Sequence, residues 1–371
     1  MTFSSFDGVI SEIPGIAVDN FENANKRAYF LSHCHRDHTQ GLSSLNLLRH
    51  LREDNVHIYT SEVSSAIISS TADFAAVKEY VVPLSLGTKT VKLEETEQHK
   101  ESYIQVTTIP AGHCFGSVMF LFKTLNKTIL FTGDFRISLN DVSKLGQLHD
   151  RNGDPINIDR MYVDTTFFNA KYENFPKRSE CVNSALVEIK NWLESSKDNY
   201  VALHPSARFG YEFVFNEIFE QLGMKVYVGG DWTLYRLFPK EVPGVTDDPT
   251  VTRIHSCSNR NDRHLHRCLP YDTSNKSYLY VHLSAMKWDN FSIEDMTFQR
   301  ISENRIDICF PTHCSRSELV NFVSYFSPKQ VTGFPNKYEM ETVKRRSNVV
   351  FRPPKRVTCR ERDVKRMKRD S

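Results

Sequence analysis

Short runs of apolar, β-branched and aromatic residues alternate with polar turns along the chain, a pattern that predicts strands. Five of these runs end on or lead into a histidine or an aspartate, and they span residues 27–32, 104–112, 128–133, 160–164 and 305–312. The segments 39–51 and 210–222 are expected to be helices. Because open α/β sheets place their sites at the ends of their strands, we expect these histidines and aspartates to lie together at one edge of a sheet.

The first strand end is unusually rich in side chains that can bind metal ions. The stretch "SHCHRDH" (32–38) holds His33, His35, Asp37 and His38. Residues i and i+2 of an extended segment point the same way, so His33 and His35 can bind one ion. Asp37 and His38 follow as the chain turns, and we expect them to face a second ion. Imidazole and carboxylate groups suit Zn²⁺, which keeps an open position for water in catalytic sites.

Two later strand ends extend this set. His113 follows the run 104–112, and Asp134 follows the run 128–133. An aspartate in this position can bridge two metal ions about 3.5–4 Å apart, the spacing used in two-metal hydrolysis. A lone histidine is more often a structural residue than a ligand, but these strand ends in combination favour a metal site.

Composition narrows the class of protein. The chain has 371 residues, of which 40% are hydrophobic and 25% charged, values typical of a globular protein with an ample core. It has no run of eighteen apolar residues, so no transmembrane helix is expected. Its first residues lack the basic and apolar regions of a signal peptide, so we expect none.

The charge is unevenly distributed. The segment 344–371 has 12 Lys/Arg and 3 Asp/Glu, a balance of +9 in a chain whose net charge is +2, so the remainder carries −7. A basic tail beside an acidic body favours a nuclear localisation signal or a segment that binds phosphate groups. A solvated disordered tail without such a role is an equal alternative.

The motifs in combination resemble those of a known family. His-x-His-x-Asp-His, "AGHCFGS" (111–117) and "TGDFR" (132–136) are similar to the metallo-β-lactamase family. "VDTTF" (163–167) and "FPTHCSRSE" (310–318) resemble motifs A and B of its β-CASP branch, and the whole set is most similar to the DNA-repair nucleases of that branch. The resemblance covers most of residues 10–330.

The resemblance implies an α/β fold, a metallo-β-lactamase αββα sandwich with an inserted β-CASP cap. Residues 1–170 would form the first part of the sandwich, 171–305 the cap, 306–343 the closing part of the sandwich, and 344–371 a basic disordered tail.

The resemblance also assigns roles to the site residues. His33, His35, His113 and Asp134 would hold the main zinc ion. Asp37 and His38 would hold a second, weaker ion, which could be zinc, magnesium or manganese. Asp37 would also be one of the catalytic residues. Asp164 and His313 match motifs A and B and would form an acid pair near the scissile phosphate. Asp19 matches an aspartate that supports the metal loop, and a turn or N-cap role is equally open for it.

Two details bear on the substrate. The RNA-cleaving members carry a motif C histidine after motif B, whereas this chain has no histidine after His313 and Val331 is the expected counterpart. The exonucleases of the DNA-repair group resemble one another in a Gly-Lys-Glu that binds a terminal 5′-phosphate, and here Tyr211 replaces the lysine. Ser206, Arg208 and Tyr211 are candidates for phosphate contact, and Tyr211 is equally compatible with a packed helix residue.

A structural zinc in the cap is a further candidate. A histidine, a His-x-Cys and a later cysteine would bind it in a DNA-repair member of this branch. His255, Cys257 and Cys268 match three of these positions, but Tyr227 stands at the first, so His264 or His266 would have to complete the set.

We therefore expect a metal-dependent DNA nuclease that processes double-strand break ends, cleaving hairpins or overhangs internally and leaving 5′-phosphate and 3′-hydroxyl groups. The alternatives are a 5′-to-3′ DNA exonuclease acting in crosslink repair or at telomeres, an RNA endonuclease, a small-molecule hydrolase and a non-catalytic scaffold. The expected partner is DNA, as single strands, overhangs or hairpins. A DNA-repair kinase complex stays open as a second partner. We expect a nuclear monomer without membrane association.

Overall fold

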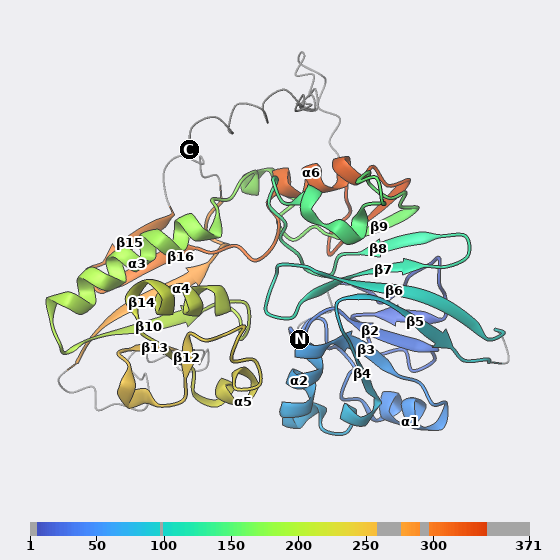
Figure 1. Ribbon diagram of the computed structural model, residues 1–371, viewed down its shortest axis with the longest axis horizontal. Coiled ribbons are helices and arrows are strands. Elements are labelled where there is room, and N and C mark those ends of the chain that lie inside the picture. Colours follow the sequence, from blue (N-terminus) through green and yellow to red (C-terminus); the bar gives the residue numbers. More distant parts are fainter. Residues whose placement is uncertain (1–5, 97–98, 258–275, 290–296, 340–371) are drawn as a thin grey trace, which may run out of the picture. The chain divides into compact units, whose positions relative to one another are not determined.

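The structure, a computed structural model, describes residues 6–96, 99–257, 276–289 and 297–339. The described residues as far as Tyr338 belong to one compact unit, shown in Figure 1. The strands that the structure describes form three sheets, two of which pack face to face, while the third is built from strands that lie between residues 199 and 309.

The first sheet has four parallel strands in the order β1-β2-β3-β4. Their bounds are Ile16–Val18 (β1), Ala28–Leu31 (β2), Ile58–Ser61 (β3) and Val81–Leu84 (β4). Helices α1 (Leu45–Glu53) and α2 (Glu62–Ser70) cover its outer face through a cluster of buried aliphatic and aromatic side chains.

The second sheet has six strands in the order β17-β9-β8-β7-β6-β5. Their bounds are Gly87–Leu93 (β5), Ser102–Pro110 (β6), Val118–Lys123 (β7), Thr128–Phe131 (β8), Arg160–Asp164 (β9) and Gln330–Phe334 (β17). The strands from β5 to β8 pair antiparallel, and β8, β9 and β17 pair parallel. Helix α6 (Arg316–Phe326) covers its outer face.

An aromatic core joins these two sheets. The ring of Phe30 on β2 lies 5.4 Å from that of Phe120 and 5.0 Å from that of Phe122, both on β7. Such contacts fill the space between the sheets with closely packed side chains. The resulting layers are helix, sheet, sheet and helix.

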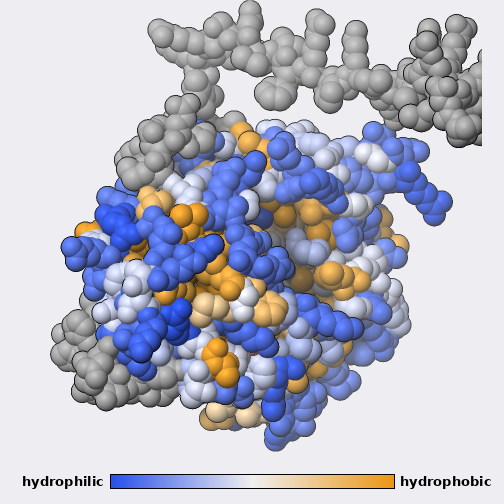
Figure 2. Space-filling model, turned by 60° about the vertical axis from the view of Figure 1, so that its left-hand side comes forward, coloured by the Kyte–Doolittle hydropathy of each residue, from blue (hydrophilic) through white to orange (hydrophobic). Residues whose placement is uncertain are grey.

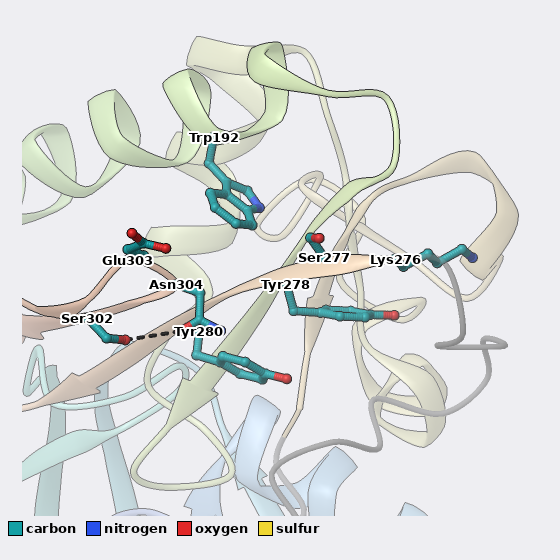
Figure 3. A pocket seen from close by; sticks show the side chains of 8 residues that line it. All are labelled: Trp192, Lys276, Ser277, Tyr278, Tyr280, Ser302, Glu303 and Asn304. Atoms are coloured by element: carbon teal, nitrogen blue, oxygen red, sulfur yellow. Dashed lines mark hydrogen bonds between the residues drawn. The ribbon is translucent and has the colours of Figure 1, made fainter.

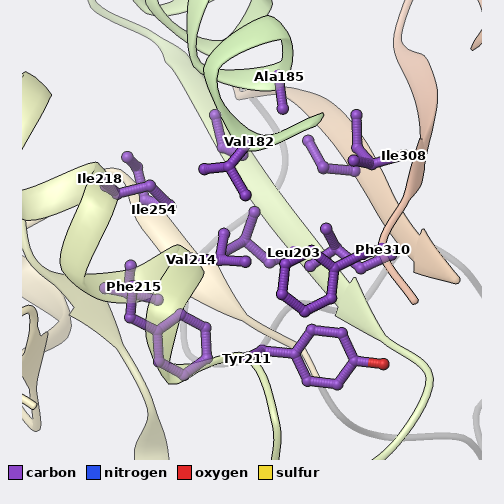
Figure 4. Packing of buried hydrophobic residues seen from close by; sticks show 14 of the residues in the cluster. Val182, Ala185, Leu203, Tyr211, Val214, Phe215, Ile218, Ile254, Ile308 and Phe310 are labelled. Atoms are coloured by element: carbon purple, nitrogen blue, oxygen red, sulfur yellow. The ribbon is translucent and has the colours of Figure 1, made fainter. Parts of the chain in front are cut away.

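The third sheet has seven strands in the order β12-β11-β13-β10-β14-β16-β15, parallel except for the pairing of β15 with β16. Their bounds are Asn199–Pro205 (β10), Val226–Tyr227 (β11), Val245–Thr246 (β12), Ile254–Ser256 (β13), Ser277–Ser284 (β14), Phe298–Ser302 (β15) and Arg305–Cys309 (β16). Helices α3 (Arg178–Ser195) and α4 (Glu212–Leu222) pack on it through the apolar cluster in Figure 4, and α5 spans Trp232–Tyr235.

Short 3-10 helices occur in the connections, at Ala72–Phe74, Lys78–Tyr80, Val142–Lys144, Gly146–Leu148, Ala170–Tyr172, Gly229–Asp231 and Pro249–Val251.

The five expected strands are confirmed as β2, β6, β8, β9 and β16. The two expected helices are confirmed as α1 and α4, although α1 begins later than the segment 39–51 suggests. Ser44 is its N-cap, with a side chain that accepts a hydrogen bond from Leu47 N, and the residues before it form turns.

The mixed α/β class is also confirmed. Strand β16 pairs within the third sheet, so this sheet extends a few residues past the boundary expected at 305. The division into sandwich and cap stays a proposal, and the tail 344–371 lies outside the described residues.

The surface mixes hydrophilic side chains with smaller hydrophobic patches on the face that Figure 2 shows. Apolar atoms commonly make up a large share of the surface of folded proteins, so these patches alone identify no site. Among the described residues, no helix is long and apolar enough to span a bilayer.

Candidate metal centre

The strand ends meet as the sequence predicts. Strands β6, β8 and β9 run in the same direction, because β7 is antiparallel to both of its neighbours and β8 is parallel to β9. Their carboxyl ends deliver His113, Asp134 and Asp164 to one edge. Strand β2, in the facing sheet, delivers His33 and His35 to the same place, since both lie beside His113.

Three histidines point one ring nitrogen each at a common centre. Nδ1 of His35 lies 3.1 Å from Nε2 of His33 and 2.9 Å from Nε2 of His113. The Oδ2 atom of Asp134 lies 3.6 Å from Nε2 of both His33 and His113. A metal ion is the usual reason for imidazole nitrogens to converge with a carboxylate in this way.

The opposite nitrogen of each ring has a hydrogen-bond acceptor. His33 Nδ1 lies 2.9 Å from Ser32 Oγ, whose own proton goes to Asp19. His113 Nδ1 donates to the carbonyl of Thr312 at 3.0 Å, and His35 Nε2 donates to the carbonyl of Phe209 at 3.2 Å. These contacts hold the proton on the outer nitrogen and leave the inner one free to bind a metal ion.

A second group of ligands adjoins the first. His38 Nε2 lies 3.2 Å from Asp134 Oδ2 and 3.5 Å from Asp37 Oδ2. Asp37, His38 and Asp134 lie close enough together to hold one ion. Because Asp134 belongs to both groups, it is placed to bridge two metal ions.

Asp19 holds the loop of residues 32–38 in place through hydrogen bonds. It is fully buried, has a φ of +54°, and accepts hydrogen bonds from Ser32 N, Ser32 Oγ and His38 Nδ1. These bonds tie the end of β2 to His38, and the role of Asp19 in supporting a metal loop stays a prediction.

A close approach of two loops brings His113 and Asp134 together. Gly112, with a φ of +69°, packs on the residue that ends the "TGDFR" motif, and a Cβ atom there would lie 2.6 Å from the Arg136 carbonyl oxygen. Glycine is therefore required next to His113.

The electrostatics keep the three converging imidazoles neutral. Burial and the neighbouring histidines hold the pKa of His33 and of His113 well below the usual value, and burial also lowers the pKa of His35. Burial opposes a charge on His38 too, but the carboxylates of Asp134 and Asp19 outweigh it and raise the pKa of His38. A neutral imidazole is the form that binds a metal ion. Buried, neutral and correctly oriented ligands therefore fit a metal ion here.

His313 and Asp164 form a separate pair beside this cluster. His313 Nδ1 lies 2.7 Å from Asp164 Oδ2, and the His313 ring lies 4.5 Å from that of His113. Burial opposes a charge on His313, but Asp164 and Asp134 outweigh it and raise its pKa to about 9. The imidazole can therefore carry a proton at neutral pH, as a general acid requires.

The three residues predicted to contact phosphate, Ser206, Arg208 and Tyr211, each form hydrogen bonds with other groups of the protein. Tyr211 is only 2% exposed, and its hydroxyl oxygen accepts a hydrogen bond from Ser206 N at 2.9 Å and contacts Ser206 Oγ. Arg208 donates to Asp231 at 2.8 Å and is otherwise largely exposed. Arg208 is thus the more accessible of the three candidates, and their phosphate role stays a prediction.

The candidate structural zinc lies partly outside the described residues, because Cys268, His264 and His266 are not described. Tyr227 pairs directly with His255 across β11 and β13, and their rings lie 5.5 Å apart. Cys257 is disulfide-bonded, a different use of a thiol from holding a metal ion. The cap zinc stays a prediction.

Two residues without a predicted role, Arg136 and Glu318, hold the loops of the site together. Arg136, in the "TGDFR" motif, donates to both carboxylate oxygens of Glu318 and to the carbonyls of Pro311 and Pro176. Glu318, in motif B, also accepts from Ser315 N. Both residues belong to the motifs that carry the family resemblance, and this membership is the sequence feature that could have identified them.

A separate pocket of about 790 Å³ lies at the start of β14. Figure 3 shows Trp192 on one side of this strand and the rings of Tyr278 and Tyr280 on the other. None of the predicted site residues lines this pocket.

Comparisons with known proteins bear on identity. No family model matches the chain. It is 32% identical to human protein artemis over 361 residues, which is 94% of this chain and 51% of that protein. It is 34% identical to the Gallus gallus protein artemis over 346 residues, 90% of this chain and 48% of that protein. The chain is homologous to the Artemis proteins.

Other matches are more distant. The DNA cross-link repair protein pso2/snm1 of Schizosaccharomyces pombe is 28% identical over 246 residues, 64% of this chain and 39% of that protein. The chain spans about half the length of the Artemis proteins it matches. A solved structure, of an Enterococcus faecalis protein of unknown function, matches with a TM-score of 0.52 at 14% identity over 83% of this chain and 75% of that one, a likeness of fold alone.

Proposed function

We propose that this chain is a metal-dependent DNA nuclease that acts in DNA repair. The observation that carries the proposal is the position of Asp134, which lies 3.6 Å from His33 and His113 and also groups with Asp37 and His38, with the His313–Asp164 pair directly beside it. The names of the curated relatives, Artemis and DNA cross-link repair proteins, support DNA as the substrate.

The proposal includes the finer fold. The two packed sheets with their outer helices correspond to a metallo-β-lactamase sandwich, and the sheet of residues 199–309 with α3 and α4 corresponds to a β-CASP cap. The chain crosses between these parts twice. It leaves the sandwich after β9, which ends at Asp164, and it returns after β16, which leads to His313.

The metal ions would be held by the residues already described. The three converging histidines, His33, His35 and His113, with Asp134 next to them, suit zinc at the main position. Asp37, His38 and Asp134 suit zinc, magnesium or manganese at the second. Bound there, divalent ions supply activation of water and neutralisation of the charge on a phosphodiester.

The protein's own acid pair acts on the leaving group. Asp164 holds the His313 imidazole through Nδ1, which leaves Nε2 to donate a proton to the leaving 3′ oxygen. The products are then a 5′-phosphate and a 3′-hydroxyl. The body of the chain is acidic, so DNA binding relies on local basic residues such as Arg208 and the basic tail.

Cleavage within a strand is favoured over trimming from an end. A terminal phosphate is a dianion at neutral pH, and the positive charge of a lysine at position 211 would attract it. Tyr211 offers no charge, and its hydroxyl is already bonded to Ser206. We therefore propose an endonuclease for hairpins, overhangs and single-stranded DNA, working as a nuclear monomer. A DNA-repair kinase complex stays open as a second partner.

One experiment separates this proposal from the exonuclease alternative, which the similarity to cross-link repair proteins favours. Purified protein is incubated with labelled hairpin DNA, overhang DNA and 5′-phosphorylated single-stranded DNA. Internal cuts near single–double strand junctions support the endonuclease. Stepwise release of mononucleotides that requires the 5′-phosphate would assign the exonuclease activity instead.

A further inference from the structure

The loop of residues 206–211, which joins β10 to α4, reaches the metal centre. Its Phe209 carbonyl oxygen lies 3.2 Å from His35 Nε2. A carbonyl oxygen can only accept a hydrogen bond, so Nε2 of His35 carries the hydrogen. Nδ1 of His35 is then the lone-pair nitrogen, and it is the one that faces His33 and His113.

His35 differs from the other two converging histidines in where its support originates. His33 is supported by Ser32, next to it in the chain, and His113 by the Thr312 carbonyl, next to His313. Phe209 instead belongs to the connection within the third sheet. One ligand of the main metal position is therefore oriented by the proposed cap.

The loop approaches the centre so closely that a side chain at Gly210 would be tightly packed and strained. Gly210 has a φ of +114°, and a Cβ atom there would lie 3.3 Å from Cys114 Cβ and 3.5 Å from the His113 carbonyl oxygen. A larger residue would be strained by its backbone conformation and would press on the residues around His113.

The loop is anchored on both sides of this contact. Tyr211 packs its ring 5.4 Å from that of Phe310 in the cluster of Figure 4, and its hydroxyl accepts a hydrogen bond from Ser206 N. Glu212, which is buried, accepts from Gly210 N at 2.9 Å and from the Tyr235 hydroxyl at 2.8 Å. Phe209 is itself 5% exposed, so its carbonyl lies in a segment fixed at several points.

We propose that the 206–211 loop is a positioning element for the metal centre. Through the Phe209 carbonyl it fixes the tautomer and ring orientation of His35, so displacement of the loop weakens metal binding. This inference rests on the proposed metal site and adds that the affinity for the ion depends on a segment outside the metal-binding strand ends. Acceptors behind metal-binding histidines commonly change metal affinity by about 10–100-fold.

The test compares two glycine variants of the full chain. Gly210→Ala displaces the loop, whereas Gly223→Ala changes a glycine that also has a positive φ, of +67°, but has nothing within 4 Å of the added Cβ. Zinc affinity is measured by competition with a chromogenic chelator, and thermal unfolding of the metal-free proteins gives the loss of stability. We expect Gly210→Ala to lose about tenfold in zinc affinity and Gly223→Ala to match the wild type.

A second variant covers the case in which Gly210→Ala does not fold. Tyr211→Phe keeps the packed ring and removes the hydroxyl that accepts from Ser206 N, and we expect a smaller loss of zinc affinity, about threefold, as the loop loosens. Wild-type zinc affinity in a folded Gly210→Ala protein, or in Tyr211→Phe when Gly210→Ala does not fold, would overturn the inference. A wild type that binds zinc but cuts no DNA would overturn the proposed nuclease and leave this inference standing.

Discussion

His313 Nδ1 lies 2.7 Å from Asp164 Oδ2, although 149 residues separate them in the chain. Asp164 is the last residue of β9, and His313 follows β16 of the third sheet, so the pair forms where the chain leaves the packed sheets and where it returns. A carboxylate bonded to one nitrogen orients the ring and directs the other nitrogen away from the carboxylate. This relationship is the basis of the acid role proposed for His313.

The acid pair predicts a loss of catalysis with little loss of metal. His313→Gln removes the proton donor, and we expect DNA cleavage to fall by about 10²–10⁴-fold, the range for one general acid. Zinc affinity should fall far less than in His35→Ala, because His313 is not among the three converging imidazoles. Single-turnover cleavage and chelator competition measure the two effects, and equal losses in both would remove the acid role.

The same pair predicts a pH dependence of stability in protein prepared without metal. The pKa of His313 is raised from an ordinary 6.5 to about 9, so its ion pair with Asp164 stabilises the fold fully below 6.5. That contribution is lost as the pH rises through about 9. The difference in unfolding free energy between wild type and His313→Gln should therefore shrink over this window. Urea titrations at a series of pH values measure it, and a difference that grows with pH would contradict the assignment.

Substitution of a metal ligand should abolish activity without unfolding the protein. His35→Ala and Asp37→Ala should each abolish cleavage, because each removes one ligand, while the far-ultraviolet circular dichroism stays close to that of the wild type. The packed cores lie on the faces of the sheets rather than at this edge, so neither change creates a cavity within them. Near wild-type turnover in either variant would show that the metal ligands are assigned wrongly.

Arg136 predicts a large effect on stability. Its side chain and that of Glu318 are only 6% and 8% exposed, so Arg136→Met leaves a buried carboxylate without its cation. We expect a loss of about 3–5 kcal/mol in unfolding free energy. The matched control is Arg300→Met, which breaks a more exposed pair with Glu188 and should cost less than about 1 kcal/mol. Similar losses in the two variants would mean that the buried pair has no special role.

The tail prediction rests on sequence. Deletion of residues 344–371 removes 12 Lys/Arg, so DNA binding should weaken and its logarithmic dependence on salt should become flatter. Fluorescence anisotropy with labelled DNA at several salt concentrations measures the slope. An unchanged slope would mean that the tail makes no phosphate contacts.

Much of the metal centre was predictable from sequence because its ligands stand at fixed distances from strand ends. Once the runs before His113 and Asp134 are strands of one sheet that run in the same direction, their carboxyl ends lie at one edge. His33, at the end of β2 in the facing sheet, lies beside them. Asp19 follows the same rule, because it stands directly after β1, which pairs parallel with β2 and so places it beside Ser32.

Contacts from distant backbone groups were not predictable in this way. The carbonyls of Phe209 and Thr312 bind His35 and His113, and a carbonyl leaves no mark on the sequence because every residue has one. Tyr211 illustrates a related limit: its position in the chain favours a phosphate role, whereas its burial depends on how the third sheet and α4 pack around it.

We propose that Asp134 serves both metal positions of a metal-dependent DNA nuclease. The most direct measurement is cleavage of labelled hairpin DNA by the wild type and by Asp134→Asn, each before and after removal of metal by a chelator and after return of zinc. We predict that wild-type cleavage disappears with the chelator, returns with zinc and yields 5′-phosphate ends, and that Asp134→Asn stays inactive throughout. Cleavage at the wild-type rate by the metal-free protein, or by Asp134→Asn, would contradict it.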